Sequence, residues 1–67
     1  MAIFNLYELV KSKIDLESVP KGTLGTILII YEGGNDFEVE FADKQGNTIN
    51  ILTVNKDNLE AANGKNE

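Results

Sequence analysis

The chain contains no cysteine, no histidine and no arginine among its 67 residues. Without cysteine it forms no disulfide and offers no thiolate to a metal ion. Histidine is the commonest general base and transition-metal ligand, so its absence argues against both kinds of site. Arginine makes the bidentate contacts by which proteins usually recognise phosphate and guanine, and all 6 basic residues here are lysine. We therefore expect no catalytic site, no cofactor and no metal site.

Positive charge and long apolar runs are also scarce. The formal net charge is −5 at pH 7, which repels nucleic acids and anionic membranes and would attract a basic partner. No apolar run approaches the roughly 20 residues that span a bilayer. The N-terminal segment reaches Glu8 without a basic residue, unlike a signal peptide. The composition predicts a cytoplasmic protein that binds neither nucleic acid nor membrane.

The length allows one domain with a thin core. A chain this short buries only about 60% of the surface that its unfolded form exposes. A ligand pocket of roughly 300–1,000 Å³ would occupy a large share of such a domain, so a shallow surface groove is expected instead of an enclosed site. We assign residues 1–61 to a single domain and expect the polar residues 62–67 to form a disordered tail.

Alternating and β-branched patterns predict the strands. The clearest is Phe37-Glu38-Val39-Glu40-Phe41, in which apolar residues alternate with glutamates. Residues 23–31 are rich in β-branched side chains, and their nearly continuous apolar character indicates either burial on both faces or a strand that bends across two faces of a barrel. Residues 48–54 form another strand. The segment 6–14 fits a first strand, and a short helix capped by Asn5 is the alternative.

Glycine, proline and asparagine mark the connections. Residues 15–21, which include the only proline, form a long loop after the first strand. Gly22 and Gly46 are turn glycines, and Gly25 marks a bend or a close backbone approach inside its strand. Asn55 is expected to cap one helical turn before a short last strand. The strand spacing predicts an all-β fold, a small five-stranded SH3-like barrel with one long loop after the first strand and a helical turn before the last.

Two glutamates and two tyrosines form the candidate partner surface. Glu38 and Glu40 share the outward face of one strand, where they give a soluble surface and could bind a divalent cation only weakly. A solvated face does not separate two pKa values, so they are not a catalytic acid–base pair. Tyr7 and Tyr31 are expected to cap the barrel, with exposure as the alternative. A groove for proline-rich peptides is weakly supported, because the chain has no tryptophan.

Three other motifs are interpreted as ordinary structure. Gly22 and Gly25 precede a strand, whereas a phosphate-binding loop enters a helix, so these are structural glycines, as is Gly46. Residues 43–47 lack the acidic ligands of a calcium loop and predict a hairpin turn. Three hydroxyl residues are candidate nucleophiles: Ser12, Ser18 and Thr53. No histidine is present to activate them.

The stretch Lys21-Gly22-Thr23-Leu24-Gly25-Thr26-Ile27 has the Gly-x-x-Gly-Thr-Ile form with which SH3-like barrels, KOW-type modules included, enter their second strand. The longer pattern adds Leu-Tyr-Glu-Leu-Val near the start, then Phe-Glu-Val-Glu-Phe-x-Asp and Asn-Ile-Leu-Thr-Val. Over residues 6–60 the chain resembles a short bacterial family, domain of unknown function 4926. The resemblance implies a freestanding SH3-like barrel without a catalytic motif, and an association with toxin proteins that would make the chain an antitoxin or immunity partner.

We expect a non-catalytic protein-interaction module whose candidate partner surface is Glu38, Glu40, Tyr7 and Tyr31. The expected partner is another protein, and a basic toxin and an adaptor's target both stay open. The alternative is an accessory structural subunit of a larger complex, for which the apolar run 27–30, if half exposed, would be the contact. RNA binding by a KOW-like barrel is the third choice and is disfavoured by charge. A monomer and a weak homodimer both stay open.

Overall fold

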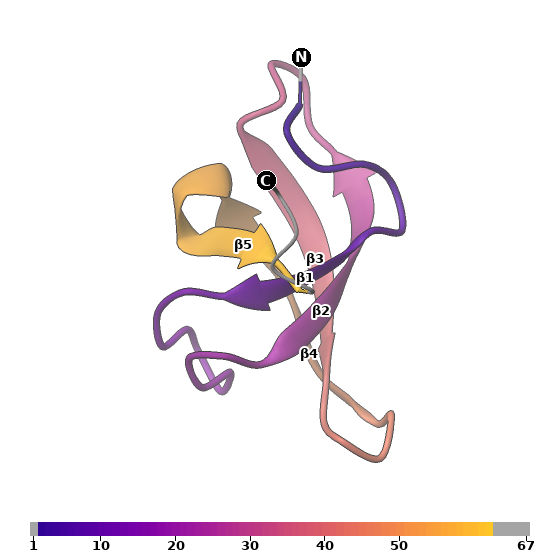
Figure 1. Cartoon of the computed structure of the whole chain (residues 1–67), viewed down its shortest axis with the longest axis vertical. Coiled ribbons are helices and arrows are strands. Elements are labelled where there is room, and N and C mark those ends of the chain that lie inside the picture. Colours follow the sequence, from indigo (N-terminus) through magenta and orange to yellow (C-terminus); the bar gives the residue numbers. More distant parts are fainter. Residues whose placement is uncertain (1, 63–67) are drawn as a thin grey trace.

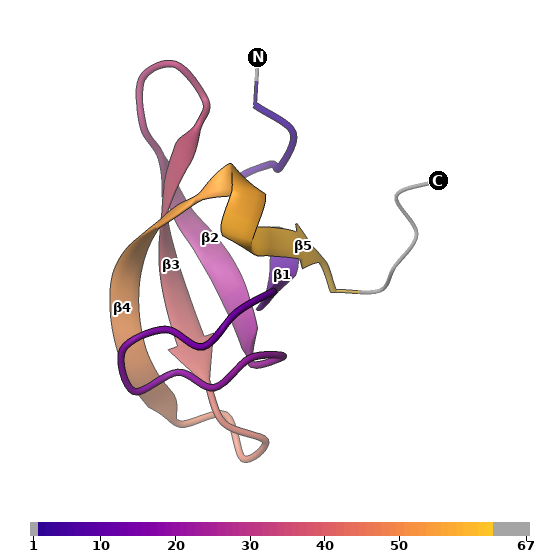
Figure 2. The same cartoon turned by 90° about the vertical axis from the view of Figure 1, so that its left-hand side faces the viewer.

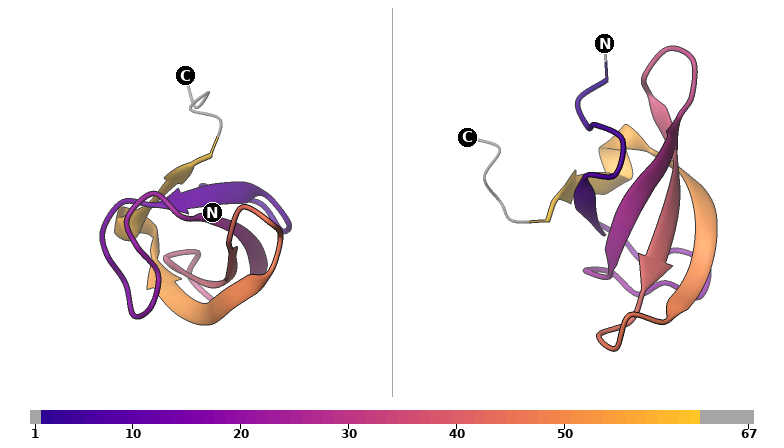
Figure 3. Two further views of the ribbon diagram at one scale, coloured as in Figure 1. Left: turned by 90° about the horizontal axis from the view of Figure 1, so that it is seen from below. Right: turned by 90° about the vertical axis from the view of Figure 1, so that its right-hand side faces the viewer.

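A computed structural model describes residues 2–62 and shows five antiparallel strands in one curled sheet (Figure 1). Their bounds are β1 (Leu9–Ser12), β2 (Leu24–Ile30), β3 (Asp36–Ala42), β4 (Thr48–Asn55) and β5 (Leu59–Ala61), with a single 3₁₀ turn, η1 (Lys56–Asn58), before β5. The order across the sheet is β4-β3-β2-β1-β5. Figure 2 shows η1 leading β5 back to β1, and the view from below in Figure 3 shows the strands curled round the interior. This is the all-β, five-stranded SH3-like barrel that the sequence predicts.

The alternation of β3 decides which side of the sheet becomes the core. Phe37, Val39 and Phe41 are fully buried, whereas Glu38 and Glu40 lie on the opposite side of the strand. Residues from every strand, from the β1–β2 loop and from the N-terminal segment complete the interior. The buried apolar residues are Phe4, Val10, Val19, Ile27, Phe37, Val39, Phe41, Val54 and Leu59.

The second strand bends, as one of the two predicted alternatives requires. Its pairing register with β3 shifts between Ile27 and Ile29. Burial on both faces is wrong, because Leu24 is 49% exposed and Ile29 is 46% exposed. A Cβ atom at Gly25 would lie 2.6 Å from Cγ1 of Val39, so the predicted close backbone approach is confirmed.

The first strand is shorter than predicted. It begins at Leu9, because the preceding residues form a turn in which Tyr7 has a φ of 66°. The Asn5 and Glu8 pair, which suggested a helix cap, closes only this one turn, with the Asn5 amide donating to Glu8 Oε1 at 2.9 Å. The predicted alternation holds within the strand itself, since Val10 is buried and Leu9 is exposed.

The long loop after β1 folds back onto the barrel. Val19 is buried and Leu16 packs against the core, and the backbone groups of these two residues bond to each other. Asn50 Nδ2 on β4 donates to the carbonyl oxygen of Glu17 at 3.5 Å. The loop therefore lies against β4, as Figures 2 and 3 show.

The cap before β5 is confirmed, because the Asn55 side chain accepts a hydrogen bond from the Asp57 amide at 2.9 Å. The predicted end of the domain stays a prediction. Of the expected tail 62–67, only Ala62 belongs to the described residues; its amide donates to the Leu9 carbonyl oxygen at 3.1 Å. In the part of the chain from residue 2 to residue 62, no helix has the length and apolar character needed to cross a membrane.

Candidate functional site

Glu38 and Tyr31, two of the four residues predicted for the partner surface, are joined by a hydrogen bond. Tyr31 directly follows β2, and its hydroxyl donates to Glu38 Oε1 at 3.1 Å. Thr53 on β4 donates to the same oxygen at 2.8 Å. On the β2 side Glu38 lies opposite Ile29. The carboxylate is thus held in place by donors from either side of β3.

Glu40 belongs to a row of side chains that crosses four strands. On β3, Glu40 lies opposite Thr26 of β2 on one side and Ile51 of β4 on the other. Thr26 in turn lies opposite Leu9 of β1. Glu40 Oε2 accepts a hydrogen bond from the Thr48 hydroxyl. Both glutamates therefore present oriented carboxylates on the same side of the sheet.

Four large apolar side chains share this side of the sheet, which we call the outer face: Leu9, Leu24, Ile29 and Ile51, each 46–55% exposed. The outward side of a half-buried antiparallel sheet is usually polar. Single exposed apolar side chains are common on soluble proteins, but a group of them on one face indicates a binding surface. The outer face therefore combines half-exposed apolar side chains with the fixed carboxylates of Glu38 and Glu40.

The tyrosines do not cap the barrel, so that interpretation is wrong. Tyr7 is 71% exposed in the turn before β1, and Tyr31 is 39% exposed above Glu38. The aromatic cap is Phe4, which is buried and meets Phe37 edge to face with ring centroids 5.5 Å apart. The structure brings Tyr31 to Glu38, but within residues 2–62 it records no side-chain hydrogen bond from Tyr7 to Tyr31, Glu38 or Glu40.

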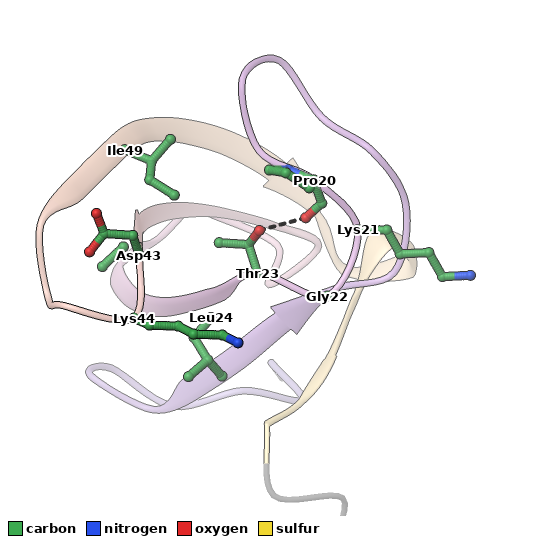
Figure 4. Close-up of a pocket in the computed structure, with 9 residues that line it drawn as sticks. Pro20, Lys21, Gly22, Thr23, Leu24, Asp43, Lys44 and Ile49 are labelled. Atoms are coloured by element: carbon green, nitrogen blue, oxygen red, sulfur yellow. Dashed lines mark hydrogen bonds between the residues drawn. The ribbon is translucent and has the colours of Figure 1, made fainter.

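Two adjoining hollows, both open to solvent, lie at one end of the outer face. The larger has a volume of about 400 Å³ and lies between residues 20–24 on one side and Asp43, Lys44 and Ile49 on the other (Figure 4). The smaller, of about 180 Å³, shares Leu24, Ala42 and Asp43 with it and extends to Leu9 and Glu40. Their open form agrees with the groove expected from the chain length.

A buried serine holds one rim of the larger hollow. The Ser12 hydroxyl donates to the carbonyl oxygen of Pro20 at 3.0 Å. Ser12 Oγ in turn accepts from the amides of Gly22 and Thr23 at 3.1 and 3.3 Å. Asp15 Oδ1 also accepts from the Lys21 amide at 2.8 Å. Ser12, a candidate nucleophile by sequence, therefore fixes the loop that forms this rim.

Asp43 holds the opposite rim. Its Oδ1 accepts from the backbone amides of Gln45 and Asn47, each at 2.9 Å. These bonds, chiefly the one from Asn47, hold the pKa of the Asp43 carboxyl below its ordinary value. The side chain is therefore a carboxylate at neutral pH. Gly46 completes the turn with a φ of 89°, which confirms a hairpin here.

Two other kinds of site were considered from the sequence, a cation site at the acidic residues and a nucleophile at a hydroxyl residue. Within residues 2–62, no three side chains of the metal-ligating acidic, histidine or cysteine types are grouped to hold an ion. The ion pair recorded over the same residues joins Lys56 to Asp57, away from the outer-face glutamates. The Thr53 hydroxyl is bonded to Glu38.

Sequence reasoning named the run 27–30, which contains Ile29, as a possible apolar contact but missed Leu9, Leu24 and Ile51 on the outer face. In residues 48–54 apolar side chains stand at both odd and even positions, so the sequence does not show which set faces outward. Pairing with β3 decides it, because Ile51 lies opposite Glu40 and Leu52 opposite buried Val39. The role of Asp43 had a local signal, since aspartate at the start of a glycine-containing turn commonly accepts from amides further along it.

Comparison with known protein families gives a match that covers all five strands. The family model described as domain of unknown function (DUF4926) matches residues 6–61, from the turn before β1 to the end of β5. No curated protein and no solved structure matches the chain. The chain belongs to the DUF4926 family.

Proposed function

We propose that this protein is a non-catalytic protein-binding module that docks its partner on the outer face of β1–β4. The observation that carries the proposal is the grouping of four half-exposed apolar side chains with the fixed carboxylates of Glu38 and Glu40. Protein interfaces combine an apolar centre with polar groups that set orientation. The hydrogen bonds to the two glutamates reduce the ordering cost of binding.

The charge of the chain supports a basic partner. The net charge is −5, and the three ionisable residues of β3, Asp36, Glu38 and Glu40, are all acidic. Lys11 at the border of this face is placed opposite Glu60 on β5. Lysines or arginines on the partner would be steered towards this face and paired with it. Two kinds of basic partner fit this chemistry. The domain could neutralise a basic toxin, or it could act as an adaptor that links a basic protein to other proteins.

The proposal is tested by affinity capture from the native host on three baits, with elution by a salt gradient. The baits are the natural chain, an outer-face variant carrying Glu38→Gln and Glu40→Gln, and a control carrying Glu17→Gln and Glu32→Gln. The two variants lose the same charge, and the control residues are exposed on loops. We expect one basic protein that is retained by the natural chain and the control and is released from the outer-face variant at lower salt. Equal release from all three baits would refute the proposal.

A second candidate function is an accessory structural subunit of a larger complex. Its supporting observation is that one residue of the apolar run 27–30 is exposed: Ile29 is 46% exposed, whereas Ile27 is fully buried and Ile30 packs against the core. A permanent subunit would stay bound through high salt, because apolar contact is not screened. Ile29→Ser would then release the partner, and Glu38→Gln with Glu40→Gln would not.

A further inference from the structure

We infer that the two hollows bind a short segment of the partner in which a large apolar residue stands next to a lysine or arginine. The apolar side chain fills the larger hollow, and the basic side chain reaches Glu40 and Asp43 through the smaller one. This inference rests on the proposed function, because it names the chemistry by which the partner is recognised.

The larger hollow is suited to an apolar side chain. Its volume of about 400 Å³ is enough for one large side chain with its flanking backbone. Leu24 and Ile49 line it and are 49% and 37% exposed, so both have apolar surface that a ligand would cover. Ala42 and Pro20 add further apolar lining, and Figure 4 shows the position of Pro20.

The smaller hollow is suited to a basic side chain. Glu40 and Asp43 are the titratable residues among those that line it, and Leu9 and Leu24 stand beside them. A lysine or arginine can lay its aliphatic part along leucine side chains while its charged end meets a carboxylate. Glu40 Oε2 is bonded to Thr48, and Oε1 makes no recorded hydrogen bond within residues 2–62.

The lysines of the larger hollow direct the basic residue to the smaller one. Lys44 stands on the rim of the larger hollow, whereas the side chain of Lys21 extends away from it (Figure 4). The larger hollow has both Lys44 and Asp43 at its rim, whereas the smaller is lined by the carboxylates of Glu40 and Asp43 without a lysine. A cation is therefore attracted more strongly to the smaller hollow, and a carboxylate is repelled from it. The site therefore selects an apolar–basic pair over an apolar–acidic pair.

Both rims are fixed before a ligand arrives. The Ser12 hydroxyl makes three hydrogen bonds to residues 20–23, and Asp43 Oδ1 accepts two from the amides of its own turn. A preformed site loses little conformational freedom on binding, which favours recognition of a short segment.

Nuclear magnetic resonance of the full-length, ¹⁵N-labelled chain tests the inference with defined peptides. The probes are acetylated and amidated Gly-Phe-Lys-Gly, Gly-Phe-Glu-Gly and Gly-Ala-Lys-Gly, titrated to millimolar concentration. We expect the Phe-Lys peptide to shift the amides of Leu24, Ala42 and Asp43, with a Kd about tenfold lower than that of either other peptide. Absence of shifts at these three residues, or equal binding of the Phe-Glu peptide, would overturn the inference.

Two further variants separate failure of this inference from failure of the proposed function. Glu40→Gln with Asp43→Asn keeps the hydrogen-bond acceptors but removes both charges, and Glu38→Gln changes the outer face outside the hollows. We expect the first variant to weaken binding of the Phe-Lys peptide about fivefold to tenfold and to release the captured partner at lower salt. Release of the partner by Glu38→Gln alone would refute the hollows and leave the proposed function standing. Release by neither variant would refute both.

Discussion

Replacing Gly25 with alanine tests the close packing of β2 against β3 in the core. The new Cβ would lie 2.6 Å from Val39 Cγ1 and 2.9 Å from Phe41 Cδ1, whereas carbon atoms in good contact are about 3.5–4.0 Å apart. Val39 and Phe41 are fully buried and cannot move into solvent. Overpacking of this kind costs about 1–3 kcal/mol.

An opposing effect reduces the expected cost. Alanine restricts the unfolded chain more than glycine does, which stabilises the folded state by about 0.4–1 kcal/mol. We therefore expect Gly25→Ala to lower the free energy of unfolding by about 1–2 kcal/mol. A domain of this length has a total stability of about 3–10 kcal/mol. The midpoint of thermal unfolding should accordingly fall by about 4–16 °C.

Thermal and urea unfolding, followed by circular dichroism, measure the change, and Val39→Ala supplies the matched test. That substitution removes the atom nearest to the new methyl group. The double variant should therefore be more stable than the sum of the two single effects predicts, by about 1 kcal/mol. An unchanged or raised midpoint for Gly25→Ala, or additive effects in the double variant, would refute the close-packing argument.

Three further predictions concern the elements that position the candidate site. Ser12→Ala should lower the free energy of unfolding, measured with urea, by about 1–3 kcal/mol, because the buried hydroxyl is hydrogen-bonded to three backbone groups of residues 20–23. A loss below about 0.5 kcal/mol would contradict this role. Asn55→Ala should cost about 1 kcal/mol by the same method, since the cap on Asp57 is lost, and an unchanged urea midpoint would count against the cap. The pKa of Asp43 is lowered in the folded state, so its stabilising effect is present above the unfolded pKa and is lost as the pH falls through the folded pKa. The amide resonances of Gln45 and Asn47 should accordingly titrate with a midpoint below 3.8, whereas a midpoint above that value would refute the hydrogen-bonding account.

Local signals in the sequence predict much of the barrel. Apolar and acidic residues alternate without interruption in residues 37–41, so the buried and exposed sides of β3 follow directly from the side-chain period of a strand. Asn55 has the side chain and the position of a cap, and the structure confirms the turn that follows. Gly25 stands alone in an apolar strand, which indicated the close approach now found.

Features that depend on pairing between distant residues were not predictable in the same way. Tyr7 adopts a φ of 66°, which is uncommon for a bulky side chain, and its turn shortens the first strand. Ser12 bonds to residues 8 to 11 positions further along the chain, and no periodic pattern reports such a contact.

In the candidate site, too, some features follow from local sequence and others depend on the pairing of distant strands. The outward position of Glu38 and Glu40 follows from the alternation of their own strand. The apolar side chains beside them follow from the register of β2 and β4 against β3 and from the shift after Ile27. The larger hollow forms where the β1–β2 loop and the β3–β4 hairpin meet, and the smaller is lined by residues of β1, β2 and β3, so both depend on the closed barrel.

The central claim is that the outer face binds a basic protein, and calorimetry with the purified partner tests it most directly. The natural chain, the variant with Glu38→Gln and Glu40→Gln, and the control with Glu17→Gln and Glu32→Gln are titrated at low and at physiological salt. We predict that the outer-face variant binds at least about tenfold more weakly than the natural chain, while the control changes the affinity by less than about twofold. Equal affinities for the two variants would contradict the account, because Glu38 and Glu40 would then contribute no more to binding than glutamates placed elsewhere.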